Sequence, residues 1–149
     1  MLRTSIVLLN PSREQERHLN QLAEASDILW NIANYERRQA HFNYGNMPNY
    51  ANQCKTLKEE EAFRKLGTCK AQALLSKLKE AWLSFYALLR LAKKGGLPPH
   101  IRHVSPPRYR KRDERKTKSI YVRNDGWWMD EKALSISKKL EIPYQCGEL

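Results

Sequence analysis

The hydrophobic pattern of the sequence changes its period after Pro98-Pro99. From Leu19 up to this point apolar residues recur mainly at intervals of three and four, which is the spacing of a helix buried along one side. After it, apolar residues alternate with polar ones or form short β-branched runs, which is typical of strands. With 149 residues, 41% of them hydrophobic, the chain can enclose a core as one compact domain or as two small interlocked ones. The α+β class is therefore predicted.

A short strand is expected before the helices. Ser5–Leu9 is a β-branched-rich run that ends at Asn10-Pro11, so the pattern predicts a strand over 2–9. The next four residues, Ser12-Arg-Glu-Gln15, have the form of a capping box, in which the side chains at both ends satisfy backbone amides. A helix should therefore begin here, and its apolar stripe predicts that it continues to about Phe42.

Two further helical segments are expected. Gly, Pro and Asn residues break the pattern over 43–49, and the polar stretch over 50–66 is weakly periodic but favours a helix. Gly67 separates it from the strongest helical pattern, over 68–94, whose apolar and aromatic residues follow the 3.6-residue period. Most of these aromatic side chains are expected in the core and not at a cofactor site.

The last third of the chain is expected to form a small antiparallel sheet. The pattern predicts, in order, a strand, a hairpin turn, its return strand, a second turn and two more strands, at Ser119–Arg123, Asn124–Gly126, Trp127–Met129, Asp130–Lys132, Ala133–Ser137 and Leu140–Ile142. The fold prediction is therefore an N-terminal strand, an inserted bundle of about three helices and a small antiparallel, β-barrel-like sheet.

The adjacent tryptophans Trp127 and Trp128 have two interpretations. Neighbouring residues in a strand point to opposite faces, so one of the two rings should fill the core. The other is then a stacking platform for a ligand or a cap over the sheet edge, and the sequence does not distinguish these roles.

Positive charge is concentrated in one part of the chain. The protein carries 27 Lys and Arg against 16 Asp and Glu, a formal net charge of +11. Nine of these basic residues and only two acidic ones lie between Pro98 and Arg123, so this stretch alone contributes +7. A concentrated block of this kind predicts attraction of a polyanion, whereas a diffuse excess would indicate only a soluble basic protein.

Basic and aromatic residues interleave within this block, over 105–123, which we call the basic arm. Arginine forks suit phosphate oxygens, and tyrosine rings can stack on unpaired bases. The prolines at its start cannot join a ladder, so the arm is expected to begin outside the sheet. It could instead be a solvated loop whose charges bind nothing specific. The predicted contacts in the arm are Arg108, Tyr109, Arg110, Lys111, Arg112, Arg115, Lys116, Lys118, Tyr121 and Arg123.

No catalytic or metal-binding pattern is found. The acidic residues lie mainly on helical segments, and there is no Gly-rich phosphate loop, His-Glu-x-x-His motif or nucleophile elbow. The three cysteines are widely spaced and lack the paired spacing of zinc ligands, so reduced thiols are expected. We therefore expect no metal and no cofactor. With no signal peptide or membrane span in the sequence, a cytoplasmic location, in a prokaryotic cytosol or nucleoid, is expected.

Several motifs occur in an order that resembles the N-terminal half of the TnpB (OrfB-type) transposon proteins. These are compact RNA-guided nucleases related to the type V CRISPR effectors. The matching motifs are Leu29-Trp-Asn31, a helix with Gln72, Leu75, Leu78, Ala81-Trp82 and Phe85, the segment Pro107-Arg-Tyr-Arg-Lys-Arg112, and Leu134-Ser-Ile-Ser-Lys-Lys-Leu140. The resemblance covers nearly the whole chain.

The resemblance implies a domain organisation. Residues 1–10 would be the first strand of a β-barrel "wedge" domain, 11–97 an inserted helical recognition domain, and 98–149 the remainder of the wedge. In the family these domains grip a guide-RNA scaffold and inspect the duplex beside the target, so the arm would contact RNA or heteroduplex backbone. Gln72 would lie near the target-adjacent motif. The nuclease half of the family, with its acidic residues and zinc ribbon, would follow Leu149.

The expected function is therefore that of a nucleic-acid-binding module without a catalytic site. Its expected partners are RNA of the guide or scaffold kind and DNA, with a nuclease-half polypeptide as a possible protein partner and no membrane. The first alternative is a sequence-specific binder of duplex DNA, such as a transposase accessory protein or regulator, which would use arginines of the first helix. A small metal-dependent nuclease and a structural ribonucleoprotein component are the other two.

Overall fold

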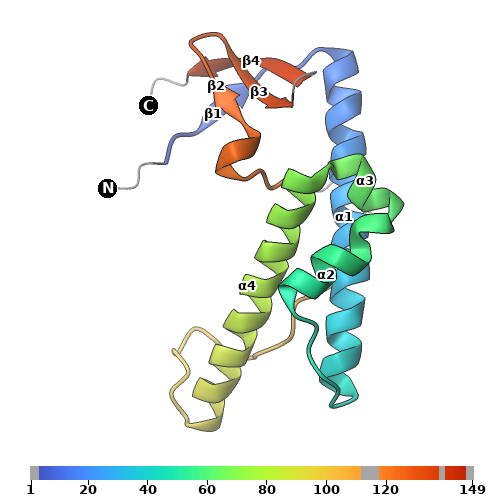
Figure 1. Ribbon diagram of the computed structural model, residues 1–149. Coiled ribbons are helices and arrows are strands. Elements are labelled where there is room, and N and C mark those ends of the chain that lie inside the picture. Colours follow the sequence, from blue (N-terminus) through green and yellow to red (C-terminus); the bar gives the residue numbers. More distant parts are fainter. Residues whose placement is uncertain (1–3, 112–117, 138–139, 147–149) are drawn as a thin grey trace.

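The computed structural model describes residues 4–111, 118–137 and 140–146, and it places a small sheet at one end of a group of helices (Figure 1). Four α-helices lie within the described residues, and all of them precede Gly95. Strand β1 (Val7–Leu9) comes before the helices, and β2 (Trp128–Met129), β3 (Ala133–Ser137) and β4 (Leu140–Cys146) come after them. The predicted α+β class and the order of its parts are confirmed.

Helix α1 (Arg13–Phe42) begins and ends where the sequence predicts. Both bonds of the capping box are present. The amide of Gln15 donates to Ser12 Oγ at 3.3 Å, and the amide of Ser12 donates to Gln15 Oε1 at 2.9 Å. Gln15 Nε2 also donates to the carbonyl of Glu141 in β4 at 2.6 Å, so the first turn of the helix is joined to the sheet.

The weakly periodic stretch over 50–66 folds as two short helices. These are α2 (Tyr50–Thr56) and α3 (Glu61–Leu66), and the 3-10 turn η1 (Leu57–Glu59) separates them. Gly67, at φ 80° and ψ 156°, then reverses the chain into α4 (Thr68–Lys93), which agrees with the predicted helix to within a residue. In Figure 1, α2 and α3 return along α1 and α4 then runs in the direction of α1.

The main core lies between α1, α3 and α4. Leu29, Leu74, Leu75 and Leu78 are fully buried in it, as is Trp82, whose indole N–H donates to Asn34 Oδ1 at 2.9 Å. A buried indole N–H needs such a partner because its desolvation would otherwise be unfavourable. The expectation that the aromatic residues of this helix are largely core residues is confirmed for Trp82 and Phe85.

The four strands form one antiparallel sheet in the order β1-β4-β3-β2. The sheet is open, so the barrel-like closure expected from the sequence is not seen in the described strands. Its inner face adds Leu140 and Ile142 to the core. The Asp130–Lys132 turn is confirmed: Asp130 Oδ1 accepts from the amides of Lys132 and Ala133, each at 2.8 Å, and β2 pairs with β3 across it.

Several predictions for the strands were wrong. Ser119–Arg123 is not a strand, because Ser119 gives its carbonyl to Ser26 Oγ of α1 and Ile120 and Tyr121 pack against the core. Asn124–Gly126 forms a 3-10 turn, η2, and not a hairpin, since no strand precedes it. The first strand spans Val7–Leu9 instead of 2–9. Residues 4–6 carry no ladder, and residues 1–3 lie outside the described chain.

Neither adjacent tryptophan fills the core. Trp127 is 44% exposed and Trp128 is 54% exposed. The prediction that one of them is buried was therefore wrong. Trp128 lies on β2, an edge strand of two residues that pairs with β3.

Candidate nucleic-acid interface

The start of the basic arm lies along one face of α1. Asn34 Nδ2 and Arg38 Nη1 both donate to the carbonyl of Pro107, at 3.0 and 2.9 Å. Trp30 Nε1 donates to the carbonyl of Arg108 at 3.1 Å. These contacts fix the backbone of the arm, and as predicted the segment forms no strand.

Asn31 holds the next part of the arm with two hydrogen bonds. Its Nδ2 donates to the carbonyl of Arg110 at 2.9 Å, and its Oδ1 accepts from the amide of Arg110 at 2.8 Å. Asn34 follows Asn31 by three residues and Trp30 by four, and Arg38 follows Asn34 by four, so these side chains form one stripe on α1. These hydrogen bonds fix the position of the arm backbone at residues 107–110.

Arg110 points inward. Its Nη1 lies 3.3 Å from Asp27 Oδ1 and donates to Ser26 Oγ at 3.2 Å, and the side chains of the Arg110–Asp27 pair are only 20% and 15% exposed. The guanidinium lies over the rings of Trp30 and Tyr121, 4.4 and 5.6 Å from their centroids. Arg110 and Tyr121, both predicted to contact nucleic acid, are thus used within the protein to secure the arm.

Arg108 and Lys111 are exposed, and so is Tyr109 between them. The carbonyl of Arg108 accepts from Trp30 Nε1 of α1, and the residue as a whole is exposed. Their role in nucleic-acid binding stays a prediction. Arg112, Arg115 and Lys116 were also predicted to bind, but they lie outside the described residues.

Gln72 and Arg123, 51 residues apart in the sequence, are in contact. Arg123 Nη1 donates to Gln72 Oε1 at 2.7 Å. Arg123 also forms a two-bond pair with Asp125, with Nε–Oδ1 and Nη2–Oδ2 distances of 3.1 and 2.5 Å. The hydrogen bonds of this pair raise the pKa of Arg123 and lower that of Asp125. The site thus presents a neutralised cation beside the Gln72 amide, at the start of α4.

Lys118, the last predicted arm residue, is half-buried. It lines a hollow of about 620 Å³ between the first turns of α1 and the sheet, together with Leu9, Leu19, Asn20, Ala23, Glu24, Ile120 and Ile136. Lys118 therefore lies beside the third turn of α1, whereas Arg108 and Arg110 contact a later part of the same helix.

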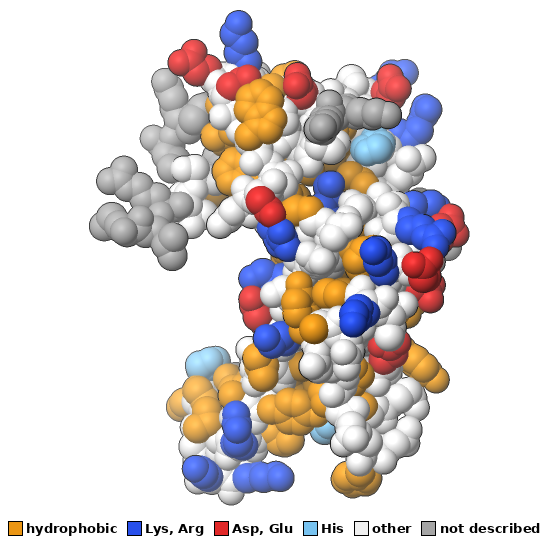
Figure 2. All heavy atoms as spheres, viewed as in Figure 1, with side chains coloured by type: hydrophobic (Ala, Val, Ile, Leu, Met, Phe, Trp, Pro, Cys, Tyr) orange, Lys and Arg blue, Asp and Glu red, His pale blue; other side chains and the backbone are white. Residues whose placement is uncertain are grey.

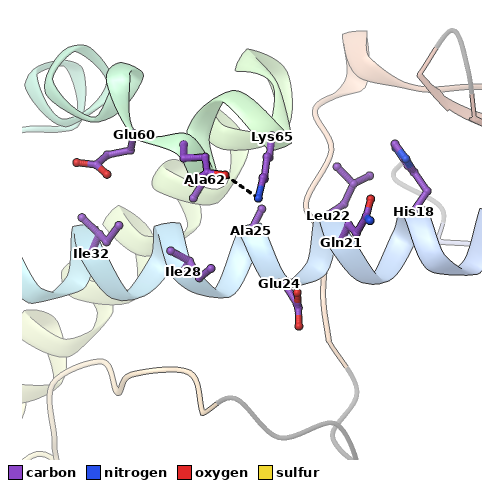
Figure 3. A pocket seen from close by; sticks show the side chains of 11 residues that line it. His18, Gln21, Leu22, Glu24, Ala25, Ile28, Ile32, Glu60, Ala62 and Lys65 are labelled. Carbon is purple, nitrogen blue, oxygen red and sulfur yellow. Dashed lines mark ion pairs between the residues drawn. The ribbon is translucent and has the colours of Figure 1, made fainter.

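A second hollow, of about 610 Å³, lies between α1 and α3 (Figure 3). Its floor is apolar and includes Ala25, Ile28 and Ala62, whereas Glu24, Glu60 and Glu61 supply carboxylates. Lys65 of its lining is paired with Glu61. This hollow is on a different side of α1 from the stripe that holds the arm, and its acidic groups are unsuited to phosphate.

Two groups of residues were missed by sequence reasoning. The polar stripe of Trp30, Asn31 and Asn34 holds the arm, and its signal was the recurrence of polar side chains at helical spacing beside the apolar stripe. Arg38, at the far end of the same stripe, lies between two aromatic rings, those of Phe42 and Tyr109, with its Cζ 5.2 Å from each centroid. No local pattern indicates that pair, since Tyr109 is far away in the sequence.

Other kinds of site find little support in the part of the chain that the structure describes. No group of three or more His, Cys, Asp or Glu residues there is placed to hold a metal ion. Cys54 and Cys69 are free thiols, and burial raises the pKa of Cys54. Among the described residues no helix combines the length and the apolar character needed to cross a membrane.

Lys and Arg side chains are spread along the helical part in Figure 2.

Comparison with known proteins adds a family relationship. The chain matches no family model. It is 47% identical over 135 residues to a TnpB-like protein, ORF457, of Acidianus two-tailed virus. The alignment covers 86% of this chain but only 28% of the relative, so the chain spans less than a third of that protein's length. The chain therefore matches a fragment of a TnpB-like protein.

Proposed function

We propose that this chain is the nucleic-acid-binding module of a TnpB-like transposon protein and that it holds structured RNA through the basic arm. The observation that carries the proposal is how the arm is mounted. Trp30, Asn31 and Asn34 bind its backbone, so Arg108 and Lys111 stay exposed in a fixed arrangement. Cations held in place lose less conformational entropy on binding phosphates than cations on a free loop.

The finer parts of the proposal come from the family. Residues 1–10 and 98–149 would form the wedge domain and 11–97 the recognition domain, with guide-RNA scaffold and target heteroduplex as ligands. Gln72 and Arg123 would lie at the target-adjacent duplex. Cleavage would belong to a nuclease part outside this module, either in the same protein or in a partner polypeptide.

The alternative of a sequence-specific binder of duplex DNA loses support. It relied on four arginines of α1, and two of them are engaged inside the protein. Arg37 is 3% exposed, with its Nε donating to Gln53 Oε1 at 2.7 Å. Arg38 donates to the arm. Only Arg13 and Arg17 are exposed for groove contacts.

The test is a salt titration of binding to a structured RNA, with the whole chain and a duplex DNA competitor. Neutralising Z phosphates gives a slope of about −0.7Z in log K against log salt for single strands and about −0.9Z for B-DNA. We expect a steep slope, and we expect the double variant Arg108→Ala/Lys111→Ala to reduce its magnitude by about 1.4.

The matched control is the double variant Arg13→Ala/Arg17→Ala. It removes the same charge from the first turns of α1, where the proposal expects little change. A flat salt response of the unmodified chain would contradict the proposal. A greater loss in the control than in the arm variant, with preference for one duplex sequence, would favour the DNA-binding alternative.

A further inference from the structure

A guanidinium lies between two exposed aromatic rings at the end of α1. Arg38 Cζ is 5.2 Å from the centroids of both Phe42 and Tyr109. The two rings come from different parts of the chain, one from the last residue of α1 and one from the basic arm. Phe42 is 54% exposed and Tyr109 is 43% exposed. Two partly exposed rings therefore lie against one cation.

The three side chains are held in place from behind. Arg38 Nη1 donates to the carbonyl of Pro107, two residues before Tyr109. The residues on either side of Tyr109 are anchored through Arg108 to Trp30 and through Arg110 to Asn31. His41 lies edge-on to Phe42, with the ring centroids 5.0 Å apart. The rings are therefore positioned before any ligand arrives.

The core does not need these two rings. Trp82 and Phe85 fill the same end of the helix pair, and they pack on each other at right angles with centroids 5.6 Å apart. Tyr86 lies beside them and shares a hydrogen bond with His41 at 3.1 Å. The core of this region is therefore closed by other side chains, and about half of the surface of Phe42 and of Tyr109 stays exposed.

The chemistry of this site fits one class of ligand. A flat ring with an exposed face stacks on a nucleobase, and the guanidinium on its inner side adds positive charge to the surroundings. Arg108 precedes Tyr109 in the chain and is exposed, and its guanidinium can donate hydrogen bonds to a phosphate of the bound strand. Bases within a duplex have both faces covered by their neighbours, so only unpaired bases can use the rings.

We propose that Tyr109 and Phe42, with Arg38 between them, form a stacking site for unpaired bases of single-stranded RNA. The inference rests on the proposed function and deepens it: the arm supplies charge, and this site selects single-stranded segments over duplex. The selectivity is independent of base sequence, because every base has a stacking face.

The test measures the anisotropy of labelled oligonucleotides with the whole chain. The probes are a single-stranded RNA, the same strand with its central bases replaced by abasic residues, and the corresponding RNA duplex. We expect Tyr109→Leu and Phe42→Leu each to weaken binding of the intact single strand about tenfold, within the range for one base–aromatic stack. The salt slope should be unchanged because no charge is removed.

Three controls make the outcome specific. Tyr109→Phe keeps the ring and should bind like the unmodified chain. The abasic strand and the duplex should bind all ring variants equally. Trp128→Leu removes an equally exposed ring from β2 and should have no effect. Thermal unfolding of each variant shows whether a loss reflects the site or the fold.

The results separate this inference from the proposed function. A steep salt slope with no loss in Tyr109→Leu, or an equal loss on the abasic strand, would overturn the stacking site and leave the proposed function standing. A loss in Trp128→Leu alone would place stacking on the sheet and overturn the site. A flat salt slope of the unmodified chain would overturn both.

Discussion

Neighbouring arginines in the basic arm have opposite roles. Arg108 is exposed, whereas Arg110 is turned toward α1, where it pairs with Asp27 and lies over Trp30. The difference follows from α1, whose Ser26 and Asp27 bind the guanidinium of Arg110. Asn31 also holds the backbone at Arg110 with two hydrogen bonds.

Replacing Arg110 should therefore affect stability. We expect Arg110→Ala to lower the free energy of unfolding by about 2 kcal/mol, since it removes hydrogen bonds to a charged group and a cation–π contact. Urea unfolding followed by tryptophan fluorescence measures this. Lys111→Ala is the matched control: it removes one exposed cation and should change stability by less than about 0.5 kcal/mol. Equal effects of the two substitutions would show that Arg110 does not secure the arm.

Among the helices and strands, the junction of α3 and α4 depends most on a single residue. Gly67 ends α3 through its amide, which donates to the carbonyl of Phe63 at 3.0 Å. Its own carbonyl accepts from the amide of Ala71 in the first turn of α4, also at 3.0 Å. The residue serves both helices at φ 80° and ψ 156°, a combination that only glycine adopts readily.

The substitution Gly67→Ala should be destabilising for conformational reasons alone. No atom lies within 4 Å of the position that a Cβ would occupy, so no steric clash contributes. We expect a loss of about 1–3 kcal/mol, the range for such strained backbone conformations. Gly45→Ala, where the backbone is not in the left-handed region and the nearest atom is 3.6 Å away, should be nearly neutral. Thermal unfolding of both variants, monitored by circular dichroism, makes the comparison.

At the scale of the whole molecule, α1 connects all the parts. One side of the helix packs in the core with α3 and α4, and its first turn binds β4 through Gln15. Its polar stripe holds the arm, which runs back from the end of α4 toward the sheet (Figure 1). The binding surface is therefore positioned by the same helix that organises the core.

Loosening this stripe should release the arm without unfolding the helices. We expect Asn31→Ala, which removes both bonds to the Arg110 backbone, to speed tryptic cleavage after Arg108, Arg110 and Lys111 several-fold, because proteolysis follows the population of the open state. The sites are identified by mass spectrometry of the fragments. Asn43→Ala, which removes only a surface bond to Gln39, is the control. Unchanged cleavage in Asn31→Ala would mean that the arm is held by other contacts.

The sequence by itself determined whatever depends on residues close together in the chain. The capping box at Ser12, the break at Gly67 and the periods of α1, α4 and β3 are local patterns, and the structure has these elements at or within a residue of the predicted bounds. The family relationship and the concentration of charge in the arm were also readable, because both are properties of residue order and composition.

Only the tertiary structure decided how these parts meet. Ser119–Arg123 has a strand-like pattern but forms no strand. The carbonyl of Ser119 accepts a hydrogen bond from Ser26 in α1, and Ile120 and Tyr121 pack against the core. Arg110 cannot be distinguished from Arg108 in the sequence, since its partners in α1 are about 80 residues away. The sequence predicted the site residues from their residue types, whereas the role of each one depends on its contacts with distant parts of the chain. Such contacts arise from the packing of the whole chain and leave no local signal.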